Sequence, residues 1–233
     1  MRFSRWQALG NVYLVAPPLP DATPELVREW VGDADGIVEV DVLGDDRAEV
    51  VIWNADGSQA ELSGNATRIA AAWLARETGA DVVTIVAGPR EVRVRFRPDG
   101  FAEQEVGEVR VGEAEEVDGV SFVPVDVGNP HAVVRGDPAD VTRLGPLLET
   151  HPRFPQRTNV QVARVEGDGG VTARVWERGV GETASSGTGA VAVAAACVGE
   201  GETVVRFPGG ALTVRIEAGR ATLIGPAEPL DPS

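Results

Sequence analysis

Two short segments of the chain place a serine directly before a run of small, helix-forming residues. Ser63 opens the segment SGNATR, which runs into IAAAWLARE, and Ser186 opens the segment SGTG, which runs into AVAVAAACVG. The first backbone N–H groups of a helix are unpaired and lie at the positive end of its dipole, so they bind anions. The sequence therefore predicts two half-sites that together hold one small anionic ligand.

Further polar or glycine-rich clusters interrupt the apolar pattern of the chain. Taken singly, each asparagine or glycine in them is more simply a turn residue, and NADGS at 54–58 is typical of a hairpin turn. Taken together, they supply amides, an arginine and two helix N-termini, a set that can hold a carboxylate and an ammonium group. These clusters are 9–11, 54–58, 63–65, 128–131, and 177–179 leading to 186–189, with Asn159 at the start of a strand.

The elements that must position these clusters are mostly strands. Helices are predicted at 24–31, 66–77, 138–149 and 188–198, the first with Thr23 as its N-cap and Pro24 at its first position. Alternating or β-branched runs predict strands at 49–53, 81–86, 91–97, 108–111, 121–127, 131–134, 159–165, 171–177, 203–207, 211–217 and 221–225.

The order of these elements predicts a duplicated α+β fold, because strands, a helix and more strands occur twice. The helices at 66–77 and 188–198 are apolar nearly all round, which is typical of buried helices. The acidic segment 112–119 is the best candidate for a boundary. We therefore expect an N-terminal half at 1–115, joined by the last strand at about 221–233, and a C-terminal half at 116–220.

Composition excludes several classes of partner. The 233 residues carry a net charge of -15, which argues against nucleic acid or an anionic membrane as a partner. No apolar run approaches the ~20 residues of a membrane span, and the N-terminus lacks a signal-peptide pattern, so we expect a cytoplasmic protein.

Composition also limits the chemistry. One cysteine, Cys197, rules out an internal disulfide, and two histidines are too few for a typical zinc centre. All 21 basic side chains are arginine, so no lysine exists to form a Schiff base with pyridoxal phosphate or to serve a Walker-type phosphate loop.

The clusters, in this order, resemble the diaminopimelate epimerase family of cofactor-independent amino-acid racemases. The resemblance covers nearly the whole chain and rests on seven motifs. They are LGN at 9–11, NADGS at 54–58, SGNA at 63–66, GNPH at 128–131, RTN at 157–159, ERGVGET at 177–183 and SGTG at 186–189.

The resemblance implies two pseudo-symmetric α+β domains, each a sheet wrapped around a central helix, with the active site in the cleft between them. It implies an isomerase that inverts the α-carbon of a small amino acid bearing carboxylates, from LL- to meso-diaminopimelate, in the pathway to lysine and the cell wall. It implies no cofactor and no metal. The oligomeric state is not readable from the sequence itself, and the resemblance suggests a homodimer.

The resemblance also assigns roles to residues of this chain. Ser63 and Ser186 take the two acid–base positions, and His131 supports the reacting groups. The substrate would meet Asn11, Asn54, Gly64, Asn65, Asn129, Asn159, Glu177, Arg178, Gly187 and Thr188, with backbone N–H groups of Ala66 and Gly189 completing the pocket.

The chain departs from the family at the two acid–base positions, where the family has cysteines. A serine hydroxyl is a far weaker acid than a thiol and needs an adjacent base at neutral pH. The sequence shows none directly beside either serine; nearby candidates are Asp56, Glu61, His131 and Glu182.

Three explanations of this departure are open. The serines could be activated by a group that the sequence does not reveal. They could have been introduced to stop the reaction. Or the chain is a natural paralogue, with another isomerase or dehydratase activity or with amino-acid binding alone.

Overall fold

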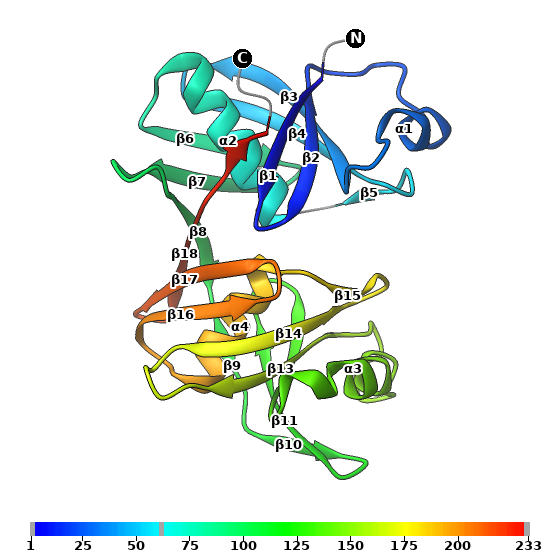
Figure 1. Ribbon diagram of the computed structural model, residues 1–233, viewed down its shortest axis with the longest axis vertical. Helices are drawn as coiled ribbons and strands as arrows, with labels where there is room; N and C mark the ends of the chain where they lie inside the picture. The colour runs from blue at the N-terminus through cyan, green and yellow to red at the C-terminus, as the bar shows by residue number, and fades with distance from the viewer. Residues whose placement is uncertain (1–2, 61–62, 231–233) are drawn as a thin grey trace. The chain divides into compact units, whose positions relative to one another are not determined.

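The computed structural model describes residues 3–60 and 63–230 (Figure 1). Contacts divide the chain into two compact units, Met1–Glu105 with Gly225–Ser233 (unit 1) and Val106–Ile224 (unit 2). The boundary expected after residue 115 falls inside unit 2, because β9 (Arg110–Val111) pairs with β11 (Val120–Asp126).

Unit 1 is a sheet wrapped around the helix α2 (Gly64–Thr78), as Figure 1 shows. Ile69, Ala70 and Leu74 of this helix are fully buried in the core of the unit. A shorter helix, α1 (Pro24–Trp30), has its own small apolar cluster. The strands are β1 (Ser4–Ala8), β2 (Asn11–Ala16), β3 (Gly36–Gly44), β4 (Arg47–Asn54), β5 (Gln59–Ala60), β6 (Val82–Ala87), β7 (Arg90–Phe96), β8 (Ala102–Glu108), which runs on into unit 2, and β19 (Glu228–Pro229).

Unit 2 repeats this plan around the helix α4 (Gly187–Cys197), whose Ala190, Val191 and Val193 are fully buried. A 3₁₀ turn, η1 (Pro138–Asp140), leads into α3 (Val141–Glu149). The remaining strands are β10 (Glu115–Val117), β12 (Pro130–Arg135), β13 (Asn159–Val165), β14 (Val171–Glu177), β15 (Gly181–Thr183), β16 (Gly201–Phe207), β17 (Gly210–Glu217) and β18 (Arg220–Gly225).

Strand pairing within each unit follows one pattern. In unit 1, β1–β2 is antiparallel, β2–β3 parallel, β3–β4 antiparallel, β4–β6 parallel and β6–β7 antiparallel. In unit 2, β11–β12, β12–β13, β13–β14, β14–β16 and β16–β17 follow the same sequence of directions. The expectation of a duplicated α+β fold, each half a sheet around a central helix, is confirmed; the cleft between the halves stays a prediction.

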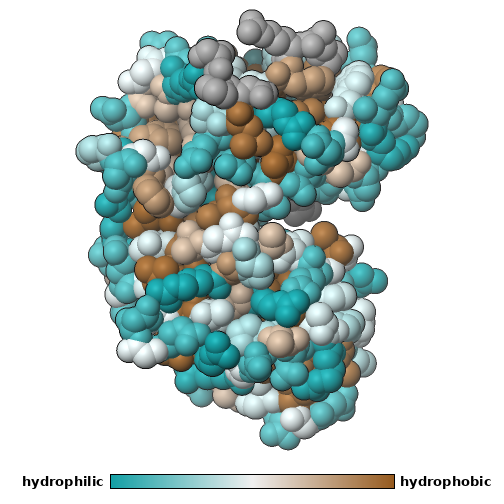
Figure 2. All heavy atoms as spheres, viewed as in Figure 1, coloured by the Kyte–Doolittle hydropathy of each residue, from teal (hydrophilic) through white to brown (hydrophobic). Residues whose placement is uncertain are grey.

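The four expected helices are present, with ends shifted by a few residues and with 138–149 divided into η1 and α3. Several strands were missed, among them β1, β2 and β3 in the first third of the chain. Hydrophilic side chains are spread over the face of the molecule in Figure 2, in keeping with the acidic composition. Among the described residues, none of the helices has the length and apolar character that crossing a bilayer requires.

Candidate active site

Ser63 is the N-cap of α2, as the turn before the alanine-rich run predicts. Its backbone is extended, with φ -134° and ψ 121°, and its Oγ accepts a hydrogen bond from the Ala66 N–H at 3.3 Å. A second hydroxyl lies beside it, because Tyr13 Oη is 3.4 Å from Ser63 Oγ. The N-terminal half-site therefore pairs a serine with a phenol at a helix N-terminus.

A buried arginine orients the asparagines of this half-site. Arg68 is fully buried on α2, and its Nη2 donates to Asn65 Oδ1 at 2.7 Å while its Nε donates to the Pro226 carbonyl at 3.0 Å. Asn65 Nδ2 then donates to Asn11 Oδ1. Burial lowers the pKa of Arg68 to about 10, so the guanidinium is still charged at neutral pH. A positive charge therefore lies inside the end of the helix where an anion would bind.

Asn54 serves the hairpin turn that the NADGS segment predicts. Its Nδ2 donates to Ser58 Oγ at 2.9 Å, and Asp56 Oδ1 accepts from the Ser58 N–H at 2.8 Å. Gly57 has φ +83°, and a Cβ there would lie 2.4 Å from the Pro24 carbonyl oxygen, so only glycine fits. The turn explains these residues fully, and a contact of Asn54 with substrate remains a prediction.

Ser186 repeats the Ser63 arrangement at the start of α4. Its backbone is extended, with φ -143° and ψ 126°, and its Oγ accepts from the Gly189 N–H at 3.2 Å. A Cβ at Gly189 would lie 3.0 Å from Ser186 Cβ, so the glycine leaves room for the serine side chain. The hydroxyl donates its own proton to Glu177 Oε2 at 3.2 Å.

The structure therefore places a carboxylate, Glu177, directly beside Ser186, where the sequence had revealed no adjacent base. Thr183 Oγ1 also donates to its Oε1, at 2.6 Å. Burial raises the pKa of Glu177 above its ordinary value, and the hydrogen bonds from Thr183 and Ser186 oppose that shift. The hairpin from β14 to β15 turns the chain back, which brings Glu177 beside a serine nine positions later.

The candidate bases named from the sequence have other partners. Asp56 serves the NADGS turn, and Glu182 accepts from Arg174 Nε at 2.6 Å. Glu61 lies outside the described residues. His131 is held between the side-chain amides of Asn129 and Gln161.

His131 orients Asn129 at the N-terminus of α4. The ring is 1% exposed; Gln161 Nε2 donates to its Nδ1 at 3.0 Å, and its Nε2–H donates to Asn129 Oδ1 at 2.9 Å. Asn129 Nδ2 donates in turn to Thr188 Oγ1 at 3.4 Å. Burial lowers the pKa of His131 to about 4, so the ring is neutral at pH 7. His131 thus orients Asn129, while its role beside the reacting groups stays a prediction, and Gln161, which the sequence analysis missed, fixes its tautomer.

Because the pKa of His131 is depressed, the ring makes folding depend on pH. An unfolded histidine takes up a proton below about pH 6.5, whereas the folded ring does not until about pH 4. Above pH 6.5, His131 should not change the free energy of unfolding. As the pH drops from 6.5 toward 4, the free energy of unfolding should fall. Urea unfolding at several pH values should show a shallower fall in His131→Gln than in the parent protein. An unchanged slope in His131→Gln would contradict the assignment.

Asn159 and Arg178 meet through the backbone. Asn159 Oδ1 accepts from the Arg178 N–H at 3.0 Å, and its Nδ2 donates to the Pro130 carbonyl at 3.0 Å. The guanidinium of Arg178 is exposed, and its Nη1 donates to the Gln156 carbonyl at 3.1 Å. A guanidinium held by one such bond keeps donors that can bind a carboxylate bidentately.

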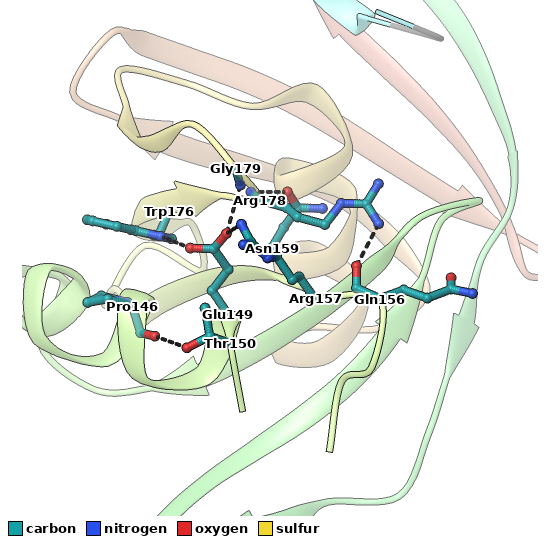
Figure 3. Close-up of polar contacts among 9 residues, drawn as sticks. All are labelled: Pro146, Glu149, Thr150, Gln156, Arg157, Asn159, Trp176, Arg178 and Gly179. Atoms are coloured by element: carbon teal, nitrogen blue, oxygen red, sulfur yellow. Dashed lines mark hydrogen bonds and ion pairs between the residues drawn. The ribbon is translucent and has the colours of Figure 1, made fainter. Parts of the chain in front are cut away.

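Glu149 fixes the turn that carries Arg178, and the sequence analysis missed it (Figure 3). The buried carboxylate accepts from Trp176 Nε1 at 2.7 Å, from the Gly179 N–H at 2.8 Å and from Arg157 Nη1 at 3.3 Å. Burial alone would raise the pKa of Glu149, and these donors outweigh it, so the pKa lies below its ordinary value. Glu149, at the end of α3, thereby binds Trp176 before Arg178 and Gly179 after it.

Gly145 on α3 makes this network possible, because the Trp176 ring packs against its bare backbone. A Cβ at Gly145 would lie 2.6 Å from Trp176 Cγ. We expect Gly145→Ala to displace the ring from Glu149 and to lower the free energy of unfolding by about 1–3 kcal/mol, although alanine ordinarily favours a helix. Gly167→Ala is the control, since a Cβ there has nothing within 4 Å. Equal stabilities of the two variants in urea unfolding would refute the packing argument.

The structure thus brings the candidates together within each unit. In unit 1, Asn65 is hydrogen-bonded to Asn11 and to Arg68. Ser63 contacts Tyr13 through their hydroxyl groups. Gly64 and Gly187 are the first residues of α2 and α4. Among residues 3–60 and 63–230, no group of three or more histidine, cysteine or acidic side chains is arranged to hold a metal ion. The linked residues of unit 2 are Asn129, His131, Asn159, Glu177, Arg178, Ser186 and Thr188.

The chain is similar to known proteins over nearly its whole length. The family model for diaminopimelate epimerase matches residues 123–228. A diaminopimelate epimerase of Desulforudis audaxviator is 38% identical over 270 residues, covering 98% of this chain and 96% of that one. Another, from a Synechococcus strain, is 32% identical and covers 99% of this chain and 96% of its own.

Solved structures share the fold at low sequence identity. A phenazine biosynthesis protein of the PhzF family from Bacillus anthracis has a TM-score of 0.74 at 13% identity, covering 99% of this chain and 98% of that one. A hydroxyproline epimerase from Agrobacterium vitis, with bound trans-4-hydroxy-L-proline, has a TM-score of 0.66 at 15% identity, covering 97% and 88%.

Proposed function

Because the chain belongs to the diaminopimelate epimerase family, we propose that it inverts the α-carbon of LL-diaminopimelate to give the meso isomer. The reaction uses neither a metal ion nor an organic cofactor. The observation that carries the proposal is the contact of Ser186 with Glu177 at 3.2 Å, which supplies a base where the family has a thiol.

The C-terminal half-site removes or returns one proton. As Ser186 Oγ takes the α-proton, its own proton passes to Glu177, and the electron pair of the broken C–H bond stays on the α-carbon. The Gly189 N–H at Ser186 Oγ stabilises negative charge on that oxygen. The N-terminal half-site supplies the second proton through Ser63, and the carbanion pair forms the new C–H bond. Proton exchange with solvent then restores both groups.

The remaining candidates hold the substrate. Arg178 binds a carboxylate, and the side chains of Asn129 and Asn159 together with the first backbone N–H groups of α2 and α4 bind its oxygens. Asn11, Asn54 and Asn65 complete the set with amide groups.

A homodimer belongs to the same proposal, and sedimentation equilibrium should then give twice the 24.5 kDa mass of the chain.

Incubation with LL-diaminopimelate in deuterated water tests the reaction. We expect deuterium at one α-carbon and formation of the meso isomer, followed by NMR. Ser186→Ala should lower both by about 10²–10⁴-fold. If the parent protein shows no exchange while calorimetry detects binding, the chain is a non-catalytic amino-acid binder and the proposed reaction is wrong.

A further inference from the structure

We propose that Tyr13 is a positioning and proton-relay residue of the N-terminal half-site, and that it passes its phenolic proton through Ser63 to the α-carbon. This inference rests on the proposed function. It assigns Tyr13 to the second of the two proton transfers, whereas Glu177 takes part in the first. The starting observation is the separation of 3.4 Å between Tyr13 Oη and Ser63 Oγ. Such contacts are often long in a protein without its substrate and tighten when the substrate binds.

The ring of Tyr13 is held in one place. Tyr13 lies on β2, is 7% exposed and pairs with Gly36 in the parallel β2–β3 ladder. A Cβ at Gly36 would lie 2.7 Å from Tyr13 Cε1 and 2.2 Å from the Trp53 carbonyl oxygen. The glycine therefore provides the space that the ring fills, which aims the hydroxyl at Ser63.

The hydrogen bonds of Ser63 suit a relay. Its Oγ already accepts from the Ala66 N–H, so the serine proton itself can be donated. As the Ser63 O–H bond breaks and the proton forms the new C–H bond, the phenol O–H breaks and its proton restores the serine hydroxyl. The negative charge leaves the α-carbon and resides on the phenolate, so atoms and charge balance without another reactant.

A phenol stabilises that negative charge better than the serine hydroxyl does. Tyrosine ordinarily ionises at a pKa of about 10, whereas an alcohol is a far weaker acid. The buried Arg68 guanidinium adds positive charge to the same half-site through Asn65, whose oxygen it binds at 2.7 Å. The half-sites therefore share the serine and the helix N-terminus but differ in the partner, a phenol in unit 1 and a carboxylate in unit 2.

A double-mutant cycle separates this role from a merely structural one. With serine at 63, we expect Tyr13→Phe to lower epimerisation by about 10²-fold or more. With Ser63→Cys, whose thiol needs no relay, the same change should cost less than about fivefold. Equal losses in both backgrounds, or no loss with serine, would overturn the proposal.

A second measurement needs no turnover, so it separates failure of this inference from failure of the proposed function. Tyr13 is the single tyrosine of the chain, so the ultraviolet absorbance of tyrosinate reports on it alone. Ser63→Ala removes a donor to the phenolate and should move the titration to higher pH by about 0.5 unit or more. Ser186→Ala, which also removes a helix cap, should leave it in place, with circular dichroism confirming the fold. Equal titrations of Ser63→Ala and the parent would overturn the pairing.

Discussion

Replacing Glu177 with glutamine is expected to lower kcat by about 10²–10⁴-fold without destabilising the protein. Glutamine can accept the hydrogen bond from one of the two hydroxyl groups, Thr183 or Ser186, through its oxygen and donate its own N–H to the oxygen of the other, so the local geometry is kept while the base is lost. Steady-state kinetics with LL-diaminopimelate measures the first part, and urea unfolding measures the second.

The stability part follows from the raised pKa of Glu177. A carboxyl whose folded pKa lies above its unfolded value contributes stability below the unfolded pKa and loses it as the pH rises through the folded pKa. Above its folded pKa the ionised, desolvated carboxylate is therefore a cost that glutamine avoids. We expect Glu177→Gln to be at least as stable as the parent at pH 7, which separates loss of the base from loss of the fold.

The pH profile gives a third readout of the same change. If Glu177 must be ionised to accept a proton, activity rises with pH through its pKa, which burial raises above the ordinary value. Glu182→Gln is the matched control, because Glu182 lies in the same motif but pairs with Arg174. A similar loss of activity in both variants would show that the motif acts as a structural unit and that Glu177 is not the base.

The helix N-termini of the site could be predicted from the sequence because their signals are local. A serine before an alanine-rich run gives a capped helix at both Ser63 and Ser186, and NADGS gives a hairpin turn, whatever the rest of the fold does. The duplicated α+β plan also followed from the order of strands and helices, whereas the strand pairings did not.

The groups that we propose activate the serines could not be predicted in this way. Glu177 reaches Ser186 only because of the β14–β15 hairpin, and Tyr13 lies on β2, a strand that propensity alone missed. The hydrophobic pattern of β13 and α3 predicts how deeply Gln161 and Glu149 are buried. It does not predict which groups these two side chains bind. Arg68 did leave a signal, since it is a charged residue within the apolar first part of α2, and a buried charge needs a partner.

Placing sulfur at both positions, with Ser63→Cys and Ser186→Cys together, is expected to raise the rate of epimerisation by about 10²-fold or more. A thiol ordinarily has a pKa of about 8.5, and a helix N-terminus lowers it further, so each thiol can exchange protons without help. Cysteine is close to serine in size, and the Ala66 and Gly189 N–H groups remain available to the sulfur atoms. Initial rates with LL-diaminopimelate, compared with the parent and with each single variant, measure the gain.

The single variants decide why the gain occurs. If each half-site limits one of the two proton transfers, either single change leaves the other transfer slow, and the double variant exceeds the product of the two single gains. Cys197 is the internal control, because it is a half-buried thiol on α4 whose pKa burial raises, and Cys197→Ser should change neither rate. A double variant that binds the substrate but gains no activity would mean that the pocket has been reshaped for another reaction, since neither acidity nor the helix N-termini would then be limiting.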